Sequence, residues 1–350
     1  MNMLPEQLQT YLGPDAQHAL VIGEEGLQFN NTPLTVNTLG DTTHTNQAYF
    51  QQVMQRTVQP LTTYRPADDT LVIELAAEVV VEQPLHVIYV HHEAVFRRHV
   101  LFVAQPFSEA KIIEHHIIAD AHQPMLIEQT LEVIVRDEAK LEYASFDAFA
   151  EMAQLQMSRF GIVERSATLT WSLGSFSSGD TQTENITQLV GAGATCQSTL
   201  MTIGMGEQKQ THLVRIDQLA PYTSGVITNH GVMRERSQGN FDGIGFIEKG
   251  AHQANAQQES RFMVLDDQAK ATTNPILLID EYDVTAGHAA SVGRVDEETL
   301  YYLQSRGLSN HEANALVTLG FLMPLIETVS DERLREKLLH VIETKVSQHV

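Results

Sequence analysis

The chain has 350 residues, of which 43% are hydrophobic and 19% charged, a composition typical of a globular protein with a large core. Its 44 acidic and 22 basic residues give a net charge of −22, which repels phosphate backbones and anionic lipids and argues against a nucleic-acid partner. The single cysteine, Cys196, excludes an intramolecular disulfide and is typical of a reducing compartment.

The N-terminal segment shows no targeting signal. Residues 1–13 lack a basic region followed by an apolar run, so no signal peptide is expected. No run of 18 apolar residues occurs, which argues against a membrane-spanning helix. We therefore expect a cytoplasmic protein.

Residues 1–65 are predicted to form an N-terminal region of mixed and helical structure. One helix is predicted over residues 47–58, and Pro60 and Pro66 punctuate the end of the region. No functional role can be assigned to it from the sequence.

Residues 66–293 are predicted to form one large β domain. Short runs rich in Val, Ile, Leu and Thr follow one another, and many alternate apolar with polar residues, the period of a half-buried strand. The runs lie at residues 71–75, 79–81, 85–89, 100–103, 112–113, 131–135, 168–171, 198–202, 262–265 and 276–279.

A weak repeat makes the fold prediction more specific. An alanine followed by a polar and then an apolar residue recurs at Ala110, Ala139, Ala167 and Ala194, at intervals of 29, 28 and 27 residues. Nearly equal spacing of strand-forming segments is typical of a solenoid, in which every coil stacks on the one before. The repeat predicts a parallel β-helix with the small alanines at corners or at tight inner positions.

Residues 294–350 are predicted to form a C-terminal helical domain. Asp296 can cap a helix over residues 297–304 that ends at Gly307. Ser309 and Glu312 form a capping box for the next helix. The predicted apolar stripe of that helix comprises Ala313, Leu316, Val317, Gly320 and Phe321.

Pro324 is expected to end or kink this second helix. Ser330 can cap the last helix, which places Leu334, Leu338, Val341 and Ile342 on one face. A bundle this small buries little apolar surface of its own, so we expect it to pack on the β domain, on a partner, or on both.

The sixteen histidines do not form a recognisable metal motif. On a strand, adjacent residues point to opposite faces, so neither His91–His92 nor His115–His116 can chelate a metal as a pair. We predict structural or solvent-facing roles for these residues and for three isolated histidines, His86, His99 and His122.

The other candidate groups also favour structural roles. Cys196 lies in the repeat, where a lone thiol usually packs as a small hydrophobic group. The glycine-rich segments 191–193 and 239–245 lack the Lys-Ser/Thr of a phosphate-binding loop and are better explained as corners and close-stacked turns. No nucleophile elbow or acid–base pair stands out, so we predict a protein that is not an enzyme.

The densest group of polar residues lies where the β pattern stops, at residues 280–296. His288 stands there among Gly287, Ala289 and Ala290, so its imidazole can approach a partner backbone or an iron atom closely. A histidine that is hydrogen-bonded at a domain junction remains the alternative.

The same region carries a family resemblance. The run Asp283-Val-Thr-Ala-Gly-His288-Ala-Ala-Ser-Val-Gly293-Arg-Val-Asp296 resembles the SufB/SufD family of iron–sulfur cluster assembly proteins, and 274–307 is its most specific stretch. Further matching segments, in the same order, lie at residues 77–85, 215–217, 228–232, 240–245, 254–258, 274–280 and 300–307.

The resemblance implies a right-handed parallel β-helix with helical ends and the role of a non-catalytic scaffold in the SufBCD complex. It implies SufB as a heterodimer partner through the β-helix, the SufC ATPase docked on the C-terminal helices, and a possible homodimer when the chain is isolated. It also implies a transient iron–sulfur cluster in the complex, with FADH2 possible there, and no tightly bound cofactor on the chain alone.

The resemblance assigns candidate residues. His288 matches a family histidine thought to take part in cluster assembly at the interface with SufB. Family members often have a cysteine two residues earlier, where this chain has Ala286, and the ligand cysteines of SufB are absent, which favours the SufD branch. Candidate residues for ATPase docking are Tyr301, Arg306, Gly307, Leu316 and Phe321.

Two other classes of function remain open from the residues alone. One is a polysaccharide-active β-helix enzyme, against which the absence of a visible signal peptide counts. The other is a stand-alone binding module that uses the acidic surface. Co-purification with an ATPase and a second β-helix protein distinguishes the scaffold from both.

Overall fold

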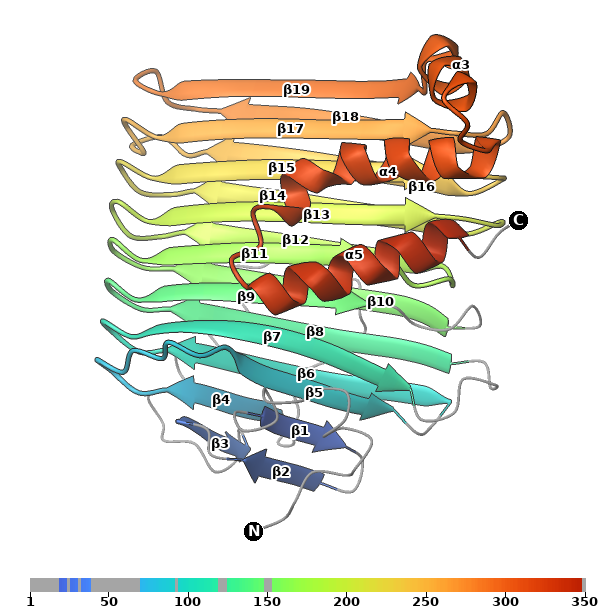
Figure 1. The fold of residues 1–350 in the computed structure, drawn as a ribbon. Coiled ribbons are helices and arrows are strands. Elements are labelled where there is room, and N and C mark those ends of the chain that lie inside the picture. Colours follow the sequence, from blue (N-terminus) through green and yellow to red (C-terminus); the bar gives the residue numbers. More distant parts are fainter. Residues whose placement is uncertain are drawn as a thin grey trace.

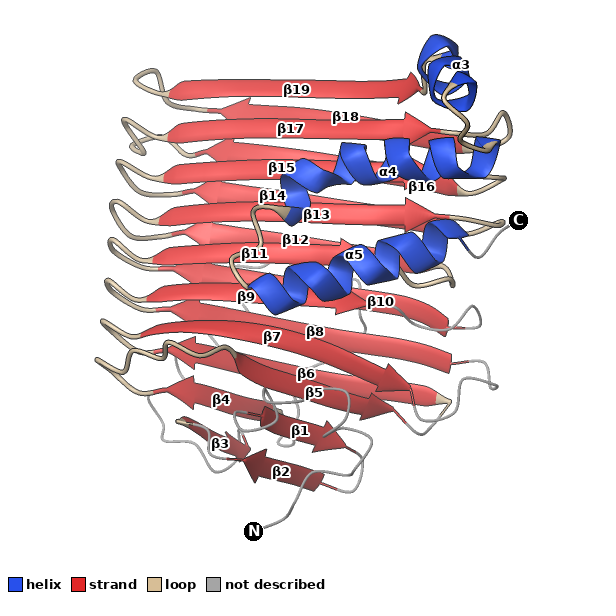
Figure 2. Cartoon of the chain, in the orientation of Figure 1, coloured by secondary structure: helices blue, strands red, loops and turns tan. Residues whose placement is uncertain are grey.

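The computed structural model describes residues 19–23, 26–30, 33–38, 70–91, 94–118, 125–147 and 153–347. These residues form a two-sheet parallel β-solenoid with three helices after its last coil (Figures 1 and 2). Successive strands alternate between the sheets. In Figure 1 the strands of the front sheet point to the right and those of the sheet behind it point to the left, while the chain rises from β5 to β19. The winding is therefore right-handed. The predicted β-helix is confirmed. The helix predicted over residues 47–58 lies outside the described residues.

The first sheet, called here the near sheet, has ten described strands. In chain order they are β1 (Ala19–Gly23), β2 (Gly26–Asn30), β5 (Leu85–His91), β7 (Glu109–Ile118), β9 (Lys140–Asp147), β11 (Thr168–Ser175), β13 (Thr195–Gly204), β15 (Ser224–Met233), β17 (Asn255–Val264) and β19 (Thr285–Arg294).

The second sheet, the far sheet, has nine described strands. They are β3 (Leu34–Thr38), β4 (Leu71–Leu75), β6 (Val95–Ala104), β8 (Met125–Val135), β10 (Ala153–Val163), β12 (Thr181–Leu189), β14 (Lys209–Gln218), β16 (Gln238–Ile247) and β18 (Lys270–Ile279). The pairs β1–β2 and β3–β4 are antiparallel, and the other paired strands are parallel.

The core fills the space between the sheets, called here the lumen. Alternate residues of each strand point into it, and the largest fully buried side chains include Trp171, Tyr89, Tyr143, Phe102 and Phe241. Because every coil is in register with the next, these side chains stack in columns, as Tyr143, Trp171 and Ser198 do on neighbouring strands. The same stacking brings polar side chains of successive coils together inside the lumen.

One corner of each coil repeats the same backbone conformation. Residues with positive φ occupy it in successive coils, and all but the first stand two residues before a near-sheet strand; they are Glu78, Phe107, Glu138, Ser166, Gly193, Tyr222 and Gln253. Their N–H groups donate to the corner carbonyl of the following coil, as Glu138 does to Arg165 at 2.9 Å. The corners therefore stack by hydrogen bonds, which satisfies backbone groups that a turn would otherwise expose.

The alanine repeat is correct for three of its four members. Ala139, Ala167 and Ala194 follow the corner residues and are fully buried. Ala110, however, pairs in register with Leu141, so the interval from β7 to β9 is two residues longer than predicted. In this coil the buried residue after the corner, equivalent to Ala139, is Ser108.

Three helices follow the solenoid: α3 (Glu297–Ser305), α4 (Asn310–Ile326) and α5 (Glu332–Ser347). Helices α4 and α5 lie across the outer face of the near sheet (Figures 1 and 2). Their apolar side chains, including Leu322, Leu338 and Ile342, share one buried cluster with Met201 and Ile203 of β13. The expected packing of the helices on the β domain is confirmed.

The predicted helix caps are partly correct. Asp296 accepts from the backbone of Glu298 and Thr299, and Ser309 forms the predicted capping box with Glu312. The last helix is capped differently, because Asp331 accepts from Leu334 N at 2.7 Å. Ser330, the predicted cap, instead accepts a hydrogen bond from Lys111 of β7.

The predicted stripe of α4 was also partly wrong. The buried residues are Ala313, Thr318, Leu322, Leu325 and Ile326, whereas Leu316 is 51% exposed. The helix continues two residues past Pro324. Its sequence is apolar on most sides, so the pattern could not distinguish the face that the sheet covers from the face that stays exposed.

Candidate functional site

The last coil leaves an open end on the solenoid. Strand β19 ends the near sheet and β18 ends the far sheet, and no described strand pairs with their outer edges. Edge strands of soluble proteins are normally short or guarded by charges, because their unpaired N–H and C=O groups accept another strand. Strand β19 is ten residues long and has no Lys, Arg, Asp or Glu before Arg294. The edge therefore has the properties of an interface.

The lumen is also uncovered at this end. Ala286, His288, Ala290 and Val292 are in register with Ala256, Gln258, Ser260 and Phe262 of β17, all of which are buried. The four residues of β19 are exposed instead, Val292 by 47%. They occupy positions that a further coil would bury.

His288 lies within this open end. Its side chain is exposed, and its register neighbour Gln258 is 5% exposed, so the imidazole stands at the mouth of the lumen. The neighbouring Ala286, Gly287 and Ala289 add little bulk. Such a histidine can offer one nitrogen to a group held by a partner.

The predicted docking residues differ in how exposed they are. Tyr301 is 76% exposed, and the Arg306 guanidinium stacks over Tyr302 at 5.2 Å. Gly307 ends α3 with φ of +99°, and no residue of that helix is buried. Leu316 faces away from the sheet. Tyr301 and Leu316 are therefore accessible in the chain alone.

Phe321 is less available. Its ring stacks on His230 of β15 at 5.0 Å, and its carbonyl oxygen lies 3.2 Å from His230 Nδ1. It also lines a groove of about 460 Å³ beside Arg261, Ala289 and Ser291, between α4 and the last strands. The groove connects the helical surface with the open end.

The lumen contains a buried charged cluster that the sequence did not indicate. The Glu114 carboxylate accepts from Tyr143 Oη at 2.6 Å and from Ser145 Oγ at 2.7 Å, and His116 Nε2 lies 3.0 Å away. Arg159 Nη2 is 3.9 Å distant. Burial alone would raise the pKa of Glu114, but the charge and hydrogen bond of His116, the charge of Arg159 and the hydrogen bond from Tyr143 lower it to about 2.

Two histidine pairs form across neighbouring coils. His86 Nδ1 lies 2.8 Å from His115 Nε2, and His91 Nε2 lies 3.0 Å from His116 Nδ1. The adjacent residues His115 and His116 thus belong to different pairs, as expected for strand neighbours. His92 and His122 lie outside the described residues.

Cys196 is a core residue. It is fully buried, and burial raises the pKa of its thiol to about 12, although a hydrogen bond with Thr187 acts in the opposite direction. At neutral pH the group is a neutral thiol, whereas metal binding and sulfur chemistry need the thiolate. The geometry agrees with the predicted packing role.

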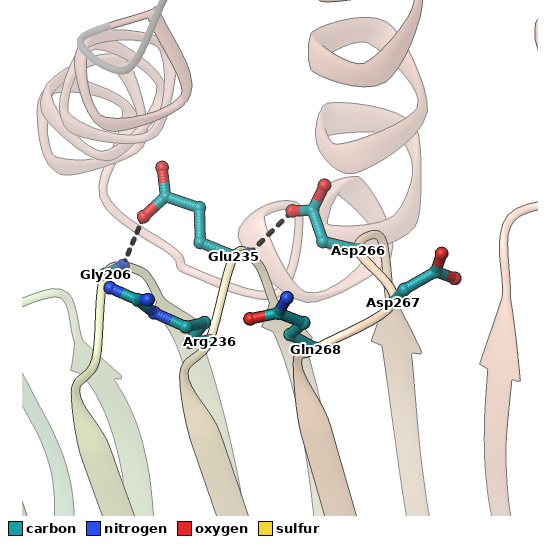
Figure 3. A pocket seen from close by; sticks show the side chains of 6 residues that line it. All are labelled: Gly206, Glu235, Arg236, Asp266, Asp267 and Gln268. Carbon is teal, nitrogen blue, oxygen red and sulfur yellow. Dashed lines mark hydrogen bonds between the residues drawn. The ribbon is translucent and has the colours of Figure 1, made fainter.

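A shallow pocket at the turns between the sheets is explained by structure alone (Figure 3). Glu235 accepts from Gly206 N at 2.6 Å, and Asp266 accepts from Glu235 N at 2.6 Å. Arg236 pairs with Glu207 of the neighbouring turn. The carboxylates therefore hold the stacked turns together, and in the described part of the chain no three or more His, Cys, Asp or Glu residues gather as a metal site.

The glycine-rich segments do not form a nucleotide site. Residues 191–193 form the corner between β12 and β13, and residues 239–245 lie within β16. Neither precedes a helix, so the helix N-terminus that binds a dinucleotide phosphate is lacking at both places. Among the described helices, none has the length and apolar character needed to cross a membrane.

Fold and open end together define the class: a parallel β-solenoid whose last described strands leave their outer edges unpaired. A family model for the SufBD core domain of the SUF system for FeS cluster assembly matches residues 87–321. The chain belongs to this family, which confirms the resemblance seen in the sequence.

Individual relatives give more detail. The iron–sulfur cluster assembly protein SufD of Bacillus subtilis is 40% identical over 271 residues, which are 77% of this chain and 62% of that protein. SufB of the same organism is 26% identical over 202 residues, 58% of this chain and 43% of that protein. A SufBD family protein of Mycobacterium tuberculosis is 29% identical over the same length. The chain thus matches less than two thirds of the length of these relatives, and its similarity to SufD exceeds that to SufB.

Proposed function

We propose that the chain is a non-catalytic scaffold subunit for iron–sulfur cluster assembly, and that it pairs with SufB through the open end of the solenoid. The observation that carries the proposal is the end formed by β18 and β19, where two long strand edges are unpaired among the described strands and the lumen is uncovered. SufB of Bacillus subtilis matches 58% of this chain, so a partner of that kind can supply coils of similar spacing.

The nascent cluster is the cargo of such a complex. Among the residues that the structure describes, Cys196 is buried and Ala286 replaces a possible thiol near His288. The proposed division of roles gives most of the thiolate ligands to SufB and at most one imidazole, from His288, to this chain. FADH2 is proposed only for the assembled complex.

The helical region is proposed to dock the SufC ATPase. Tyr301, Tyr302 and Leu316 are between 51% and 76% exposed, so they offer apolar area that a partner can cover. Arg306 beside Tyr302 adds a residue type common in interfaces.

Co-expression of this chain with SufB and SufC tests the proposal. We expect the three chains to co-purify through a tag on this chain. Elution of this chain separately from both other proteins would contradict the assembly role.

Leu316→Asp should weaken SufC docking at least tenfold, because it places a charge on an apolar contact surface. The side chain is exposed in the chain alone, so the fold should be unchanged. The measurement is the SufC dissociation constant by biolayer interferometry. Thr211→Asp on the exposed side of β14 is the control, and equal SufC affinity of the two variants would place docking elsewhere.

A further inference from the structure

One glycine of the far sheet faces polar side chains in the lumen. Gly243 of β16 is in register with Val214 and Pro275 of its neighbouring strands, on the side of the strand that faces the lumen. A Cβ added there would lie 3.3 Å from Gln258 Oε1 and 3.9 Å from Ser260 Oγ, with no other atom as close. The space is therefore bounded by two polar oxygens rather than by apolar groups.

Two side-chain amides in this part of the lumen each have one atom without a hydrogen-bond partner among the described residues. Gln258 donates from Nε2 to the Ile276 carbonyl at 3.0 Å, and Asn229 donates from Nδ2 to Ser260 Oγ at 3.3 Å. The other amide atoms, Gln258 Oε1 and Asn229 Oδ1, are buried without a partner among the described residues. If the side-chain amide is turned so that its O and N atoms exchange places, the nitrogen instead of the oxygen lacks a hydrogen-bond partner.

Other buried polar atoms without hydrogen-bond partners lie deeper in the lumen. Arg159 Nε, a donor, and Asn185 Oδ1, an acceptor, are buried without partners on neighbouring strands β10 and β12. His212 Nε2 is a third such atom, on β14. Leaving a buried polar group unsatisfied destabilises the fold, so a native structure normally supplies a partner.

These unsatisfied atoms include both hydrogen-bond donors and acceptors, which decides what kind of ligand can fill the lumen. An anion would serve the Arg159 donor but repel the carbonyl oxygens of Asn185, Asn229 and Gln258. A cation would do the reverse. Water both donates and accepts, and buried waters typically join two to four such groups.

We propose that the lumen holds ordered water, with one site bounded by Gly243, Gln258 and Ser260. This site lies directly under the open end, since Gln258 is in register with His288. Water there donates a hydrogen bond to Gln258 Oε1 and hydrates the lumen next to His288. The proposal concerns this chain alone and does not depend on pairing with SufB.

Two substitutions of Gly243 distinguish water from dry space. Gly243→Ala intrudes on the water without replacing its hydrogen bonds, so the midpoint of thermal unfolding should fall by about 2 °C or more. Gly243→Ser supplies a hydroxyl in place of the water and should recover most of that loss. Scanning fluorimetry of the full chain measures both.

Gly293 of β19 provides the matched control, because a Cβ there meets no atom within 4 Å. The difference between Gly293→Ser and Gly293→Ala is the background for a strand glycine. A Gly243→Ser variant more stable than Gly243→Ala, beyond this background, supports the water site. If Gly243→Ala is equally or more stable, the space is dry and the proposal fails.

A crystal structure of the wild-type chain at high resolution gives an independent test that needs no variant. We expect electron density for a water within hydrogen-bond distance of Gln258 Oε1. A well-ordered lumen without such density would overturn the proposal even if the substitutions of Gly243 fail to fold.

Discussion

Ala290→Asp is expected to raise the dissociation constant for SufB about 100-fold or more while leaving the chain folded. Ala290 is exposed in the chain, but its register neighbour Ser260 is 2% exposed beneath it. A partner coil on β19 would bury the new carboxylate in the same way, without a cation to pair with. Burying an unpaired charge costs several kcal/mol, and about 2.7 kcal/mol corresponds to 100-fold in affinity.

Size-exclusion chromatography with light scattering and biolayer interferometry measure this effect. Thr211→Asp introduces the same charge on β14 and should leave the affinity unchanged. The family resemblance implies a homodimer when SufB is absent, and if that dimer forms through the same end, Ala290→Asp should convert it to monomer. Normal SufB affinity of Ala290→Asp would show that the solenoid end is not the interface.

Glu114→Ala is expected to lower the free energy of unfolding by roughly 3–5 kcal/mol. The substitution leaves Arg159 without its nearest carboxylate and removes the acceptor for Tyr143 and Ser145. Glu114→Gln should cost less, because the amide oxygen still accepts hydrogen bonds. Urea denaturation followed by circular dichroism gives the values.

The pH dependence of Glu114→Gln tests the charge itself. A pKa lowered to about 2 from 4.5 means that the carboxylate stabilises the fold fully above about pH 4.5 and loses this effect as the pH falls toward 2. The shift corresponds to roughly 3 kcal/mol. The stability difference between wild type and Glu114→Gln should therefore shrink over this range.

Glu207→Ala is the matched control for the glutamate series, because the Glu207 side chain is 74% exposed and pairs only with Arg236 at the surface. It should change the stability by less than about 1 kcal/mol at any pH. A Glu114→Ala variant that is no less stable than Glu207→Ala would mean that the buried cluster carries no net stabilisation.

Local patterns predicted the elements well. The strand runs at residues 71–75 and 131–135 fall on β4 and β8, and Asp296 and Ser309 cap the helices as expected. These signals depend on neighbours in sequence, such as alternation along one strand or a hydroxyl three residues before a backbone N–H. They fail where the signal is ambiguous, as in the apolar helix α4.

The lumen could not be predicted in the same way. Glu114 meets His116 on its own strand but also Ser145 and Arg159 from strands 31 and 45 residues further along. Only the register of the coils brings them together, and an error of two residues, as at Ala110, changes every neighbour. The candidate His288 could be found because it stands in a dense local motif, whereas Gln258 and Gly243 acquire their roles from the coils above and below.

The most direct test of the account is the iron and acid-labile sulfide bound after anaerobic reconstitution, measured for the chain alone and for its complex with SufB and SufC. We predict a cluster on the complex and none on the chain, since its one cysteine is a buried neutral thiol. His288→Ala should keep the complex intact and reduce the cluster yield. A stoichiometric cluster on the isolated chain would contradict the account.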